Sequence, residues 1–282
     1  MASLQAVKQR KASVSNTRQI TKAMQLVAAS KLRKTQEAAM GPKAYIEQAK
    51  AILATLAGHP GALSNPLFRS SDSKGALTII ITSDRGLAGA YNSNVLKTSA
   101  RLLAEHPGND NVIAVGKHAS RFVSKLKDVS LLGAYELDEP DIASQVVTPV
   151  LAGAIDQFVA GTVAYVQVVY TRFISTVKQE VVVERVLPIR GIDEPMSDRI
   201  FEPNAEAVFE VAVSRALEAQ MLQYMLESRA SEHAARMLAM KNATDNANDL
   251  IDDLSLIYNN ARQAKITQEL AEISAGTEAL AQ

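Results

Sequence analysis

The longest uninterrupted helical pattern in the chain runs from Asn204 to Ala275, 72 residues that include neither proline nor glycine. Pro203 precedes the run and Gly276 follows it, which is the usual order for a helix start and a helix stop. A single helix of this length would reach roughly 108 Å at ~1.5 Å per residue, whereas helices of globular proteins average about 11–12 residues. The pattern therefore predicts a helix that an ordinary small domain cannot cover along its whole length.

The N-terminal segment carries a second helical pattern, from residue 3 to residue 40. Its apolar residues recur at spacings near three, four or their multiples, which predicts a narrow apolar seam made of Leu4, Val7, Val14, Ile20, Met24 and Val27. Gly41-Pro42 then predicts a bend or a break, because proline disfavours α geometry in the residue before it. A further helical piece is expected over about residues 43–57, followed by a linker over residues 58–75 that is rich in Gly, Pro, Ser and Asn.

The composition changes at residue 76, where β-branched runs begin to alternate with helical patterns. Residues 76–82 are almost wholly apolar, which is typical of a strand buried on both faces of a parallel sheet. The predicted helices are 87–105, 117–127 and 142–160, and the predicted strands are 76–82, 111–116, 129–132, 162–172 and 176–187, of which the last two form a hairpin. A second linker is expected over residues 189–203, in a region with several prolines.

Strands that alternate with helices between two long terminal helices predict the fold class α/β, with an antiparallel coiled coil of the N- and C-terminal helices plus a central Rossmann-like α/β domain. The expected division is an N-terminal coiled-coil helix over 1–57, a linker over 58–75, an α/β globular domain over 76–188, a linker over 189–203 and a long C-terminal coiled-coil helix over 204–282. The two ends are thus expected to meet, although the whole α/β segment separates them in the sequence.

Charge favours this meeting of the two ends. The whole chain is balanced, with 30 basic and 30 acidic side chains. Residues 1–50, however, carry 10 basic side chains against 2 acidic ones, whereas residues 204–282 carry 6 against 12, so that the two ends have formal charges of +8 and −6. Complementary charges help to set the pairing of helices; two separately solvated helix faces are the plainer alternative.

The C-terminal pattern differs from an ordinary coiled coil in two stretches. Lys241–Asp249 is polar nearly all round, which is usual for a solvent-bridging segment. Apolar residues then return at seam spacing as Leu250, Leu254, Ile257, Ala261 and Ala264, and beyond them as Ile266, Leu270 and Ile273. Because the first helix is much shorter than the last, the apolar end of the last helix is expected to extend beyond its partner. Other chains are then expected to surround this end and cover it.

The composition limits the possible chemistry. The chain has no cysteine, which excludes a disulfide framework and a thiol nucleophile. No apolar run approaches 18 residues, so that no segment is expected to span a bilayer and any membrane contact is expected to be indirect. The first ten residues lack the apolar core of a signal peptide.

The turn after the first predicted strand offers a weak nucleotide-binding signal. Gly86 and Gly89 follow a strand and open a helix, as a phosphate-binding turn would, but the dinucleotide fingerprint needs a third glycine. Gly116-Lys117 also falls short of a P-loop, because His118 and Asn111 stand where a hydroxyl residue and a glycine are needed. The alternative function is therefore an α/β nucleotide-binding enzyme with helical arms, and the plainer interpretation is a structural turn.

No constellation typical of catalysis or metal binding stands out elsewhere. None of the four histidines is spaced as a metal ligand, and His233, on the long helix, is expected to be a packed or surface residue. No Gly-x-Ser-x-Gly elbow occurs. We therefore expect no catalytic residue, no metal and no cofactor. Nucleic acid is not an expected partner, because the acidic last helix would repel it and the apolar seam of the basic first helix would stay uncovered.

Four blocks stand in order along the chain: SVSNTRQITKAMQLVAASKLR at 13–33, SDRGLAG at 83–89, SEHAARMLAMKNATDN at 231–246 and NNARQAKITQELAEISAG at 259–276. Together they resemble the gamma subunits of bacterial F-type ATP synthases, and the resemblance covers the whole chain. Several long blocks in the right order are far more specific than one short motif.

The resemblance implies a non-catalytic central-stalk rotor subunit that couples proton flow through the membrane sector to ATP synthesis and hydrolysis on the alpha/beta ring. The implied partners are the alpha and beta subunits, the epsilon subunit and the membrane c-ring, with one copy of the chain in each complex. Chloroplast relatives carry a redox-sensitive cysteine pair, which this chain lacks. Together with the lack of a transit peptide, this implies a bacterial enzyme, peripheral on the cytoplasmic side of the plasma membrane.

The resemblance also implies contact positions. The N-terminal segment that meets beta corresponds to Lys22, Met24 and Gln25. The region next to the beta catch loop corresponds to Asn242 through Asp245, and the ring-facing C-terminal positions correspond to Arg262, Gln263, Thr267 and Glu269. The turn of the α/β domain corresponds to Asp84, Arg85, Gly86 and Gly89.

Overall fold

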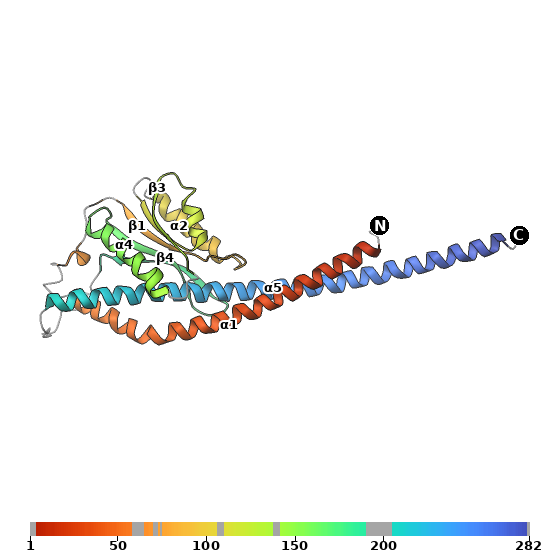
Figure 1. Cartoon of the computed structure of the whole chain (residues 1–282), viewed down its shortest axis with the longest axis horizontal. Helices are drawn as coiled ribbons and strands as arrows, with labels where there is room; N and C mark the ends of the chain where they lie inside the picture. Colours follow the sequence, from red (N-terminus) through yellow and green to blue (C-terminus); the bar gives the residue numbers. More distant parts are fainter. Residues whose placement is uncertain are drawn as a thin grey trace. The chain divides into compact units, whose positions relative to one another are not determined.

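A computed structural model describes residues 4–57, 65–69, 73, 75–105, 110–137, 142–189 and 205–280 of the chain. Its longest elements are the terminal helices α1 (Leu4–Ala57) and α5 (Ala205–Leu280) (Figure 1). Contacts divide the chain into two compact units, one made of residues 1–27 with 237–282 and the other of residues 28–236. Both terminal helices contribute to both units, and an α/β sheet belongs to the second.

The second unit is built around a five-stranded sheet with the order β3-β2-β1-β4-β5 (Figure 1). Neighbouring strands among β1 to β4 run parallel, whereas β5 runs antiparallel to β4, which confirms the predicted α/β class and the predicted hairpin. The strands are β1 (Ala76–Ile81), β2 (Asp110–Val115), β3 (Val129–Tyr135), β4 (Tyr165–Phe173) and β5 (Gln179–Leu187). The remaining elements are α2 (Tyr91–Glu105), α3 (Lys117–Val123), α4 (Thr148–Val159), the π-helical turn η3 (Ala143–Val147) and the 3-10 turn η2 (Pro66–Phe68).

Both faces of the sheet are covered, as the apolar sequence of β1 predicts. All six residues of β1 are buried. One face packs with α4 and with the part of α5 that includes Leu217 and Met225, and the other face packs with α2 and α3 through Val95 and Val123. The buried residues of α5 in this region follow the helical period, as Val213, Leu217, Met221, Tyr224 and Met225. The long helix is therefore part of the sheet's own core here.

In the first unit, α1 and α5 form the antiparallel pair that the sequence predicts. The Thr244 hydroxyl donates a hydrogen bond to the Thr21 hydroxyl at 2.8 Å, and the Arg18 guanidinium donates to the side-chain oxygen of Asn248 at 3.4 Å. The residue numbers of the bonded pairs thus rise along α1 while they fall along α5, as in an antiparallel pair. On α5 the buried residues of this unit recur at heptad spacing, as Met240, Thr244, Ala247 and Leu254. The stretch Lys241–Asp249 is therefore paired on one side and not solvated all round.

The predicted apolar seam of α1 is wrong at Ile20 and Val27, whereas Met24 between them is half-buried. Val7 is buried and Val14 is half-buried, as expected, but Ile20 and Val27 are 61% and 58% exposed. Thr21 is buried in the first unit in place of Ile20. The seam steps by seven residues from Val7, and it uses a hydroxyl side chain because Thr244 supplies a partner for it. On α5 the seam likewise includes Leu254 but leaves Leu250 and Ile257 about half exposed.

Three helix boundaries also differ from the local sequence signals. Of the two outcomes predicted at Gly41-Pro42, a bend or a break, the break is wrong, because α1 is continuous from Leu4 to Ala57. A proline within a helix removes one hydrogen bond, and it can bend a long helix without ending it. Helix α5 passes Gly276 and continues to Leu280, since a glycine within a helix costs only about 1 kcal/mol. Helix α2 begins at Tyr91 and not at Leu87, because Leu87 has φ 60°, which is left-handed backbone.

Smaller differences concern the ends of other elements. Helix α3 ends at Val123, four residues before the predicted end, and β3 continues to Tyr135, three residues past it. Much of the two predicted linkers, 58–64 and 190–203, lies outside the described residues. The predicted domain boundaries remain predictions. Among the described residues, none of the helices is both long and apolar enough to cross a membrane.

Candidate functional site

The turn after β1 lies where ligands usually bind in open α/β sheets. The chain leaves β1 for β2 on one side, while β4 lies on the other side of β1, so that the strand order reverses at β1. In such sheets ligands bind outside the carboxyl ends of the strands at this switch point. Residues Ser83 to Gly89 form the turn, with left-handed backbone at Leu87 (φ 60°) and Gly89 (φ 56°).

Asp84 ties this turn to two neighbouring strands. One carboxylate oxygen accepts a hydrogen bond from the backbone N–H of Lys117 at 3.0 Å, and the other accepts one from the backbone N–H of Leu137 at 2.7 Å. Lys117 is the first residue of α3, which follows β2, and Leu137 follows β3. A carboxylate of the protein thus takes the anion position at the Gly116-Lys117 turn, where the nucleotide-binding alternative needs a phosphate.

Gly116 is required where the chain leaves β2. Its φ is +92°, a conformation that residues with a side chain rarely adopt, and an added Cβ would lie 2.3 Å from the backbone oxygen of Thr82. The Thr82 hydroxyl accepts a hydrogen bond from the backbone N–H of Ala119 at 2.8 Å. The glycine therefore serves close packing between the ends of β1 and β2, which agrees with the plainer interpretation of this turn.

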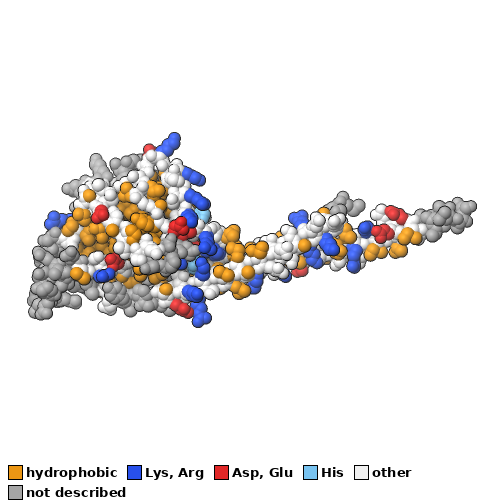
Figure 2. Space-filling model, viewed as in Figure 1, with side chains coloured by type: hydrophobic (Ala, Val, Ile, Leu, Met, Phe, Trp, Pro, Cys, Tyr) orange, Lys and Arg blue, Asp and Glu red, His pale blue; other side chains and the backbone are white. Residues whose placement is uncertain are grey.

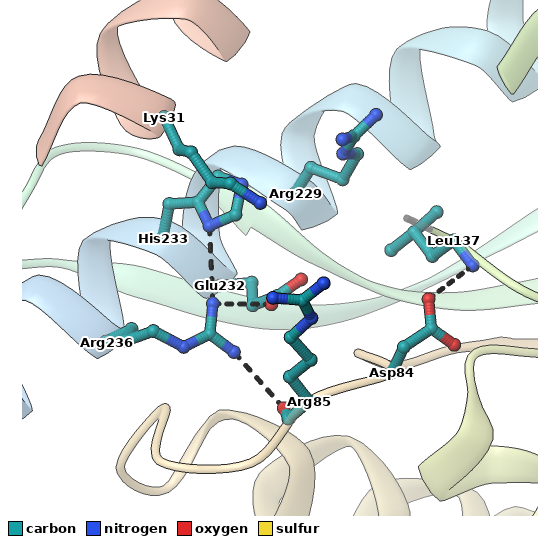
Figure 3. A pocket seen from close by; sticks show the side chains of 8 residues that line it. All are labelled: Lys31, Asp84, Arg85, Leu137, Arg229, Glu232, His233 and Arg236. Atoms are coloured by element: carbon teal, nitrogen blue, oxygen red, sulfur yellow. Dashed lines mark hydrogen bonds and ion pairs between the residues drawn. The ribbon is translucent and has the colours of Figure 1, made fainter. Parts of the chain in front are cut away.

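Arg236 of α5 holds the other side of the turn. One of its terminal nitrogens donates to the backbone oxygen of Arg85 at 3.1 Å (Figure 3). The same nitrogen donates to the backbone oxygen of Gly86 at 3.1 Å. Its other terminal nitrogen forms an ion pair with Glu232 at 2.6 Å, and the two side chains are only 11% and 9% exposed. The same nitrogen donates to Nδ1 of His233 at 3.3 Å, which places the proton of a neutral His233 on Nε2. His233 is thus a buried, packed residue, one of the two environments predicted for it.

Two serines of α5 bind the backbone of β4. The Ser228 hydroxyl accepts a hydrogen bond from the N–H of Thr171 at 3.2 Å, and the Ser231 hydroxyl donates one to the backbone oxygen of Thr171 at 3.1 Å. Pairing between β1 and β4 ends at Val169, two residues earlier. The helix therefore supplies the hydrogen bonds that a continued β1 would have made. Sequence reasoning missed this role, although two serines three residues apart on an otherwise apolar helix face were a usable signal.

The buried tyrosines do not favour acid or base chemistry. Burial, together with the negative charge of Glu232, raises the pKa of Tyr91 well above its usual value. Burial also raises the pKa of Tyr170 to about 12 and that of Tyr224 above its usual value. All three phenols therefore stay protonated near neutral pH. Within the described part of the chain, no group of three or more acidic, His or Cys residues could hold a metal ion.

The positions predicted to meet a ring of partner subunits all lie on the first unit. Lys22, Asn242 and Asp245 are exposed, whereas Met24 and Gln25 are half-buried, and the Lys22 ammonium donates to the Gln25 side chain at 3.2 Å. The four predicted positions nearer the C terminus are all exposed, and they are Arg262, Gln263, Thr267 and Glu269. Seven of these nine residues are therefore exposed, and all nine are distinct from the turn residues Asp84, Arg85, Gly86 and Gly89 of the second unit.

The end of α5 carries apolar side chains that α1 does not cover. The pairs of Thr21 with Thr244 and of Arg18 with Asn248 set an antiparallel register in which Leu4, the first described residue of α1, lies opposite residue 262 or thereabouts. Beyond that point Ile266, Leu270 and Ile273 are 48%, 59% and 63% exposed, and apolar side chains are visible along this end of the helix (Figure 2). Their spacing of four and three residues places them on one side of α5.

Comparison with known proteins identifies relatives along the whole chain. The family model described as ATP synthase matches residues 3–280. A protein of Pelotomaculum thermopropionicum named ATP synthase gamma chain is 37% identical, and the match covers 99% of this chain and 100% of that protein. A protein of Polaromonas naphthalenivorans with the same name is 39% identical over 95% of this chain and 96% of that protein.

Solved structures share the fold. A chain of the Euglena gracilis mitochondrial ATP synthase, in a structure of OSCP, F1 and c-ring, has a TM-score of 0.68 at 20% identity, with 98% of this chain and 94% of that chain covered. A chain from the central stalk and c-ring of the Tetrahymena thermophila mitochondrial ATP synthase has a TM-score of 0.60 at 24% identity, with 79% and 99% covered. At these identities the structures establish the fold, and the sequence matches establish the family. The chain belongs to the family of ATP synthase gamma chains.

Proposed function

We propose that this chain is the rotating shaft of a proton-translocating ATP synthase. A gamma chain is a non-catalytic central-stalk subunit of that enzyme, and the complex makes the ATP. In the proposal, proton flow through the membrane sector turns the chain, and its asymmetric surface meets each catalytic subunit of the alpha/beta ring in turn. Each site is thereby biased between conformations of different nucleotide affinity, because the shaft contacts the conformations differently.

The observation that carries the proposal is the uncovered apolar end of α5. Ile266, Leu270 and Ile273 are 48%, 59% and 63% exposed on one side of a helix that the described part of α1 does not reach there. Full burial of such a side chain contributes about 1.5–3 kcal/mol. A single helix in water gains little stability from its backbone alone. A protein sleeve around this end would bury the stripe and would hold the helix in one position.

The contact surface that we assign to the alpha/beta ring has three parts. The first is Lys22, Met24 and Gln25 on α1, with the exposed apolar residues Ile20, Leu26 and Val27 beside them. The second is Asn242 to Asp245 on α5. The third is the C-terminal group of Arg262, Gln263, Thr267 and Glu269. Apolar residues alternate with charged and amide groups on this surface, which suits contacts that must form and break during each turn.

We assign the remaining partners to the second unit. The epsilon subunit and the membrane c-ring are the proposed neighbours of the sheet and its helices, with one copy of the chain in each complex. The chain would then be peripheral, on the cytoplasmic side of a bacterial plasma membrane, and its membrane contact would be indirect. The bacterial sources of the sequence relatives support this assignment. The nucleotide-binding alternative is not retained, because Asp84 and Arg236 occupy the two sides of its turn.

The test is co-expression of the chain with alpha and beta subunits, followed by measurement of assembly and ATPase activity. We expect the chain to co-purify with the ring. Replacing Ile266, Leu270 and Ile273 together by serine should weaken assembly or lower ATPase activity, whereas replacing the exposed polar residues Asn259, Asn260 and Gln268 by serine should change neither. If the full-length chain never co-purifies with the ring, the proposal is wrong. Equal effects of the two triple variants would contradict the role of the apolar stripe.

A further inference from the structure

One buried layer between α1 and α5 in the first unit is polar. Among the described residues of this unit, the buried apolar side chains are Val7, Met240, Ala247 and Leu254. The buried polar ones are Thr21 and Thr244, which are 8% and 7% exposed and whose hydroxyl oxygens lie 2.8 Å apart. Burying a hydroxyl is unfavourable unless it forms a hydrogen bond. The seam therefore favours the arrangement in which these two threonines meet.

The threonine pair is part of a short network of hydrogen bonds that crosses between the helices. Thr244 donates to Thr21, and the Thr21 hydroxyl donates in turn to the backbone oxygen of Arg18 at 3.0 Å. The Arg18 guanidinium then donates to the side chain of Asn248 on α5. In the described part of the first unit, no ion pair joins α1 to α5. Opposite charges can attract the two helices to each other, but these hydrogen bonds supply the directional contacts.

A seam that repeats every seven residues does not by itself define one register. The apolar residues recur at this interval, as Val7 and Val14 do on α1, so that a shift by seven residues would again bring apolar side chains together. The same shift would place Thr21 opposite Ile251 and Thr244 opposite Val14, where neither hydroxyl meets the other. We propose that Thr21 and Thr244 are a positioning pair that fixes the register of α1 against α5. A polar residue at one seam position specifies the register of coiled coils in this way.

The register decides which parts of the two helices lie side by side. Thr21 directly precedes Lys22, where the first part of the surface assigned to the ring begins, and Thr244 lies within the second part, Asn242 to Asp245. The threonine pair therefore aligns these two parts with each other. This consequence rests on the proposed function, whereas the register itself does not.

The experiment measures the register by disulfide formation in the purified full chain, which has no cysteine of its own. Val14→Cys with Ile251→Cys marks the observed register, because these residues lie seven positions from Thr21 and Thr244 along their helices. Val14→Cys with Tyr258→Cys marks a shift of one heptad. The first pair should oxidise faster than the second. When Thr21→Val and Thr244→Val are added, the ratio of the two rates should fall about fivefold, because one hydrogen bond no longer favours the observed register.

Three controls separate the hydroxyl groups from packing. Valine has nearly the shape of threonine, so that the double valine variant should melt no lower than the unchanged chain. Thr21→Ser with Thr244→Ser keeps both hydroxyls and should keep the ratio of rates. Thr17→Val with Thr267→Val removes two exposed hydroxyls that bond only within their own helices, and it should leave the ratio unchanged.

The proposal is overturned if the double valine variant keeps the original ratio of rates, or if the exposed pair of substitutions lowers the ratio equally. It is also overturned if the serine variant lowers the ratio as much as the valine variant does, because shape and not the hydroxyl would then decide the register. The assay uses the free chain, so that failure of the proposed shaft function would not change its result.

Discussion

Removal of the Arg236 guanidinium should destabilise the second unit more than removal of any exposed positive charge. In Arg236→Met the ion pair with Glu232 is lost, and a carboxylate that is only 9% exposed keeps its charge without this partner. The bonds to the backbone oxygens of Arg85 and Gly86 are lost as well. Breaking a buried pair by removing one partner typically costs about 3–5 kcal/mol. Arg85 and Gly86 are exposed, so that water can replace part of the lost bonding, and we expect a cost of ~3 kcal/mol.

The assay is thermal unfolding of the full chain followed by near-ultraviolet circular dichroism. The chain has no tryptophan, and the buried tyrosines Tyr91, Tyr170 and Tyr224 all belong to the second unit, so that the signal reports on this unit. For 150–250 residues each kcal/mol corresponds to about 2–4 °C, which predicts a fall of the melting temperature by roughly 6–12 °C.

The matched control is Arg215→Met on the same helix. Arg215 pairs with Glu218 at 3.0 Å, but its side chain is 69% exposed, and exposed pairs contribute about 0–1 kcal/mol. A second variant, Glu232→Gln with Arg236→Met, should recover part of the loss because it leaves no buried charge. The reasoning is refuted if the two single variants shift the melting temperature equally, or if the double variant is no more stable than Arg236→Met.

Three further predictions concern other parts of the chain. In a urea titration, Gly116→Ala should lower the free energy of unfolding by at least about 2 kcal/mol, because Gly116 has a positive φ and lies close to Thr82. Gly86→Ala should lower it by less than about 1 kcal/mol, because nothing lies within 4 Å of the added Cβ. The pKa of Tyr170 is raised to about 12, so that the folded chain keeps this proton to a higher pH than the unfolded chain does. The free energy of unfolding should therefore fall as the pH rises above about 10, and it should fall less steeply in Tyr170→Phe. Identical pH profiles of the two proteins would contradict this prediction. Met24→Lys should lower the number of protons pumped per ATP in the assembled complex, because it adds a charge to the proposed beta contact; unchanged pumping would remove Met24 from that surface.

The α/β layers could be predicted from the sequence because burial determines their composition. Strand β1 is apolar throughout since both of its faces are covered. The pairing of α1 with α5 could be inferred from opposite charges and helical periods. Its register could not, because the seam uses Thr21 while leaving Ile20 exposed. A small polar side chain is acceptable in the seam only because Thr244 bonds to it, and that partner is more than two hundred residues away.

The turn after β1 was predicted as an element, but its bonding was not. Asp84 and Arg236 make their contacts across long sequence separations, so that no local pattern indicates which backbone groups they bind. Local preference at Gly41-Pro42 predicts a bend or a break without deciding between them, and the structure keeps α1 continuous there. Where a contact with a distant residue decides the local structure, reasoning from the sequence alone predicts the locally preferred conformation instead.

Rotation of the chain against an immobilised alpha/beta ring is the most direct test of the shaft function. Because the chain has no native cysteine, Asn94→Cys on the exposed side of α2 provides a single attachment point for a fluorescent or gold probe. On addition of ATP the probe should rotate in one direction and stop when ATP is removed. Steady ATP hydrolysis by the complex with a probe that stays fixed in orientation would contradict the account.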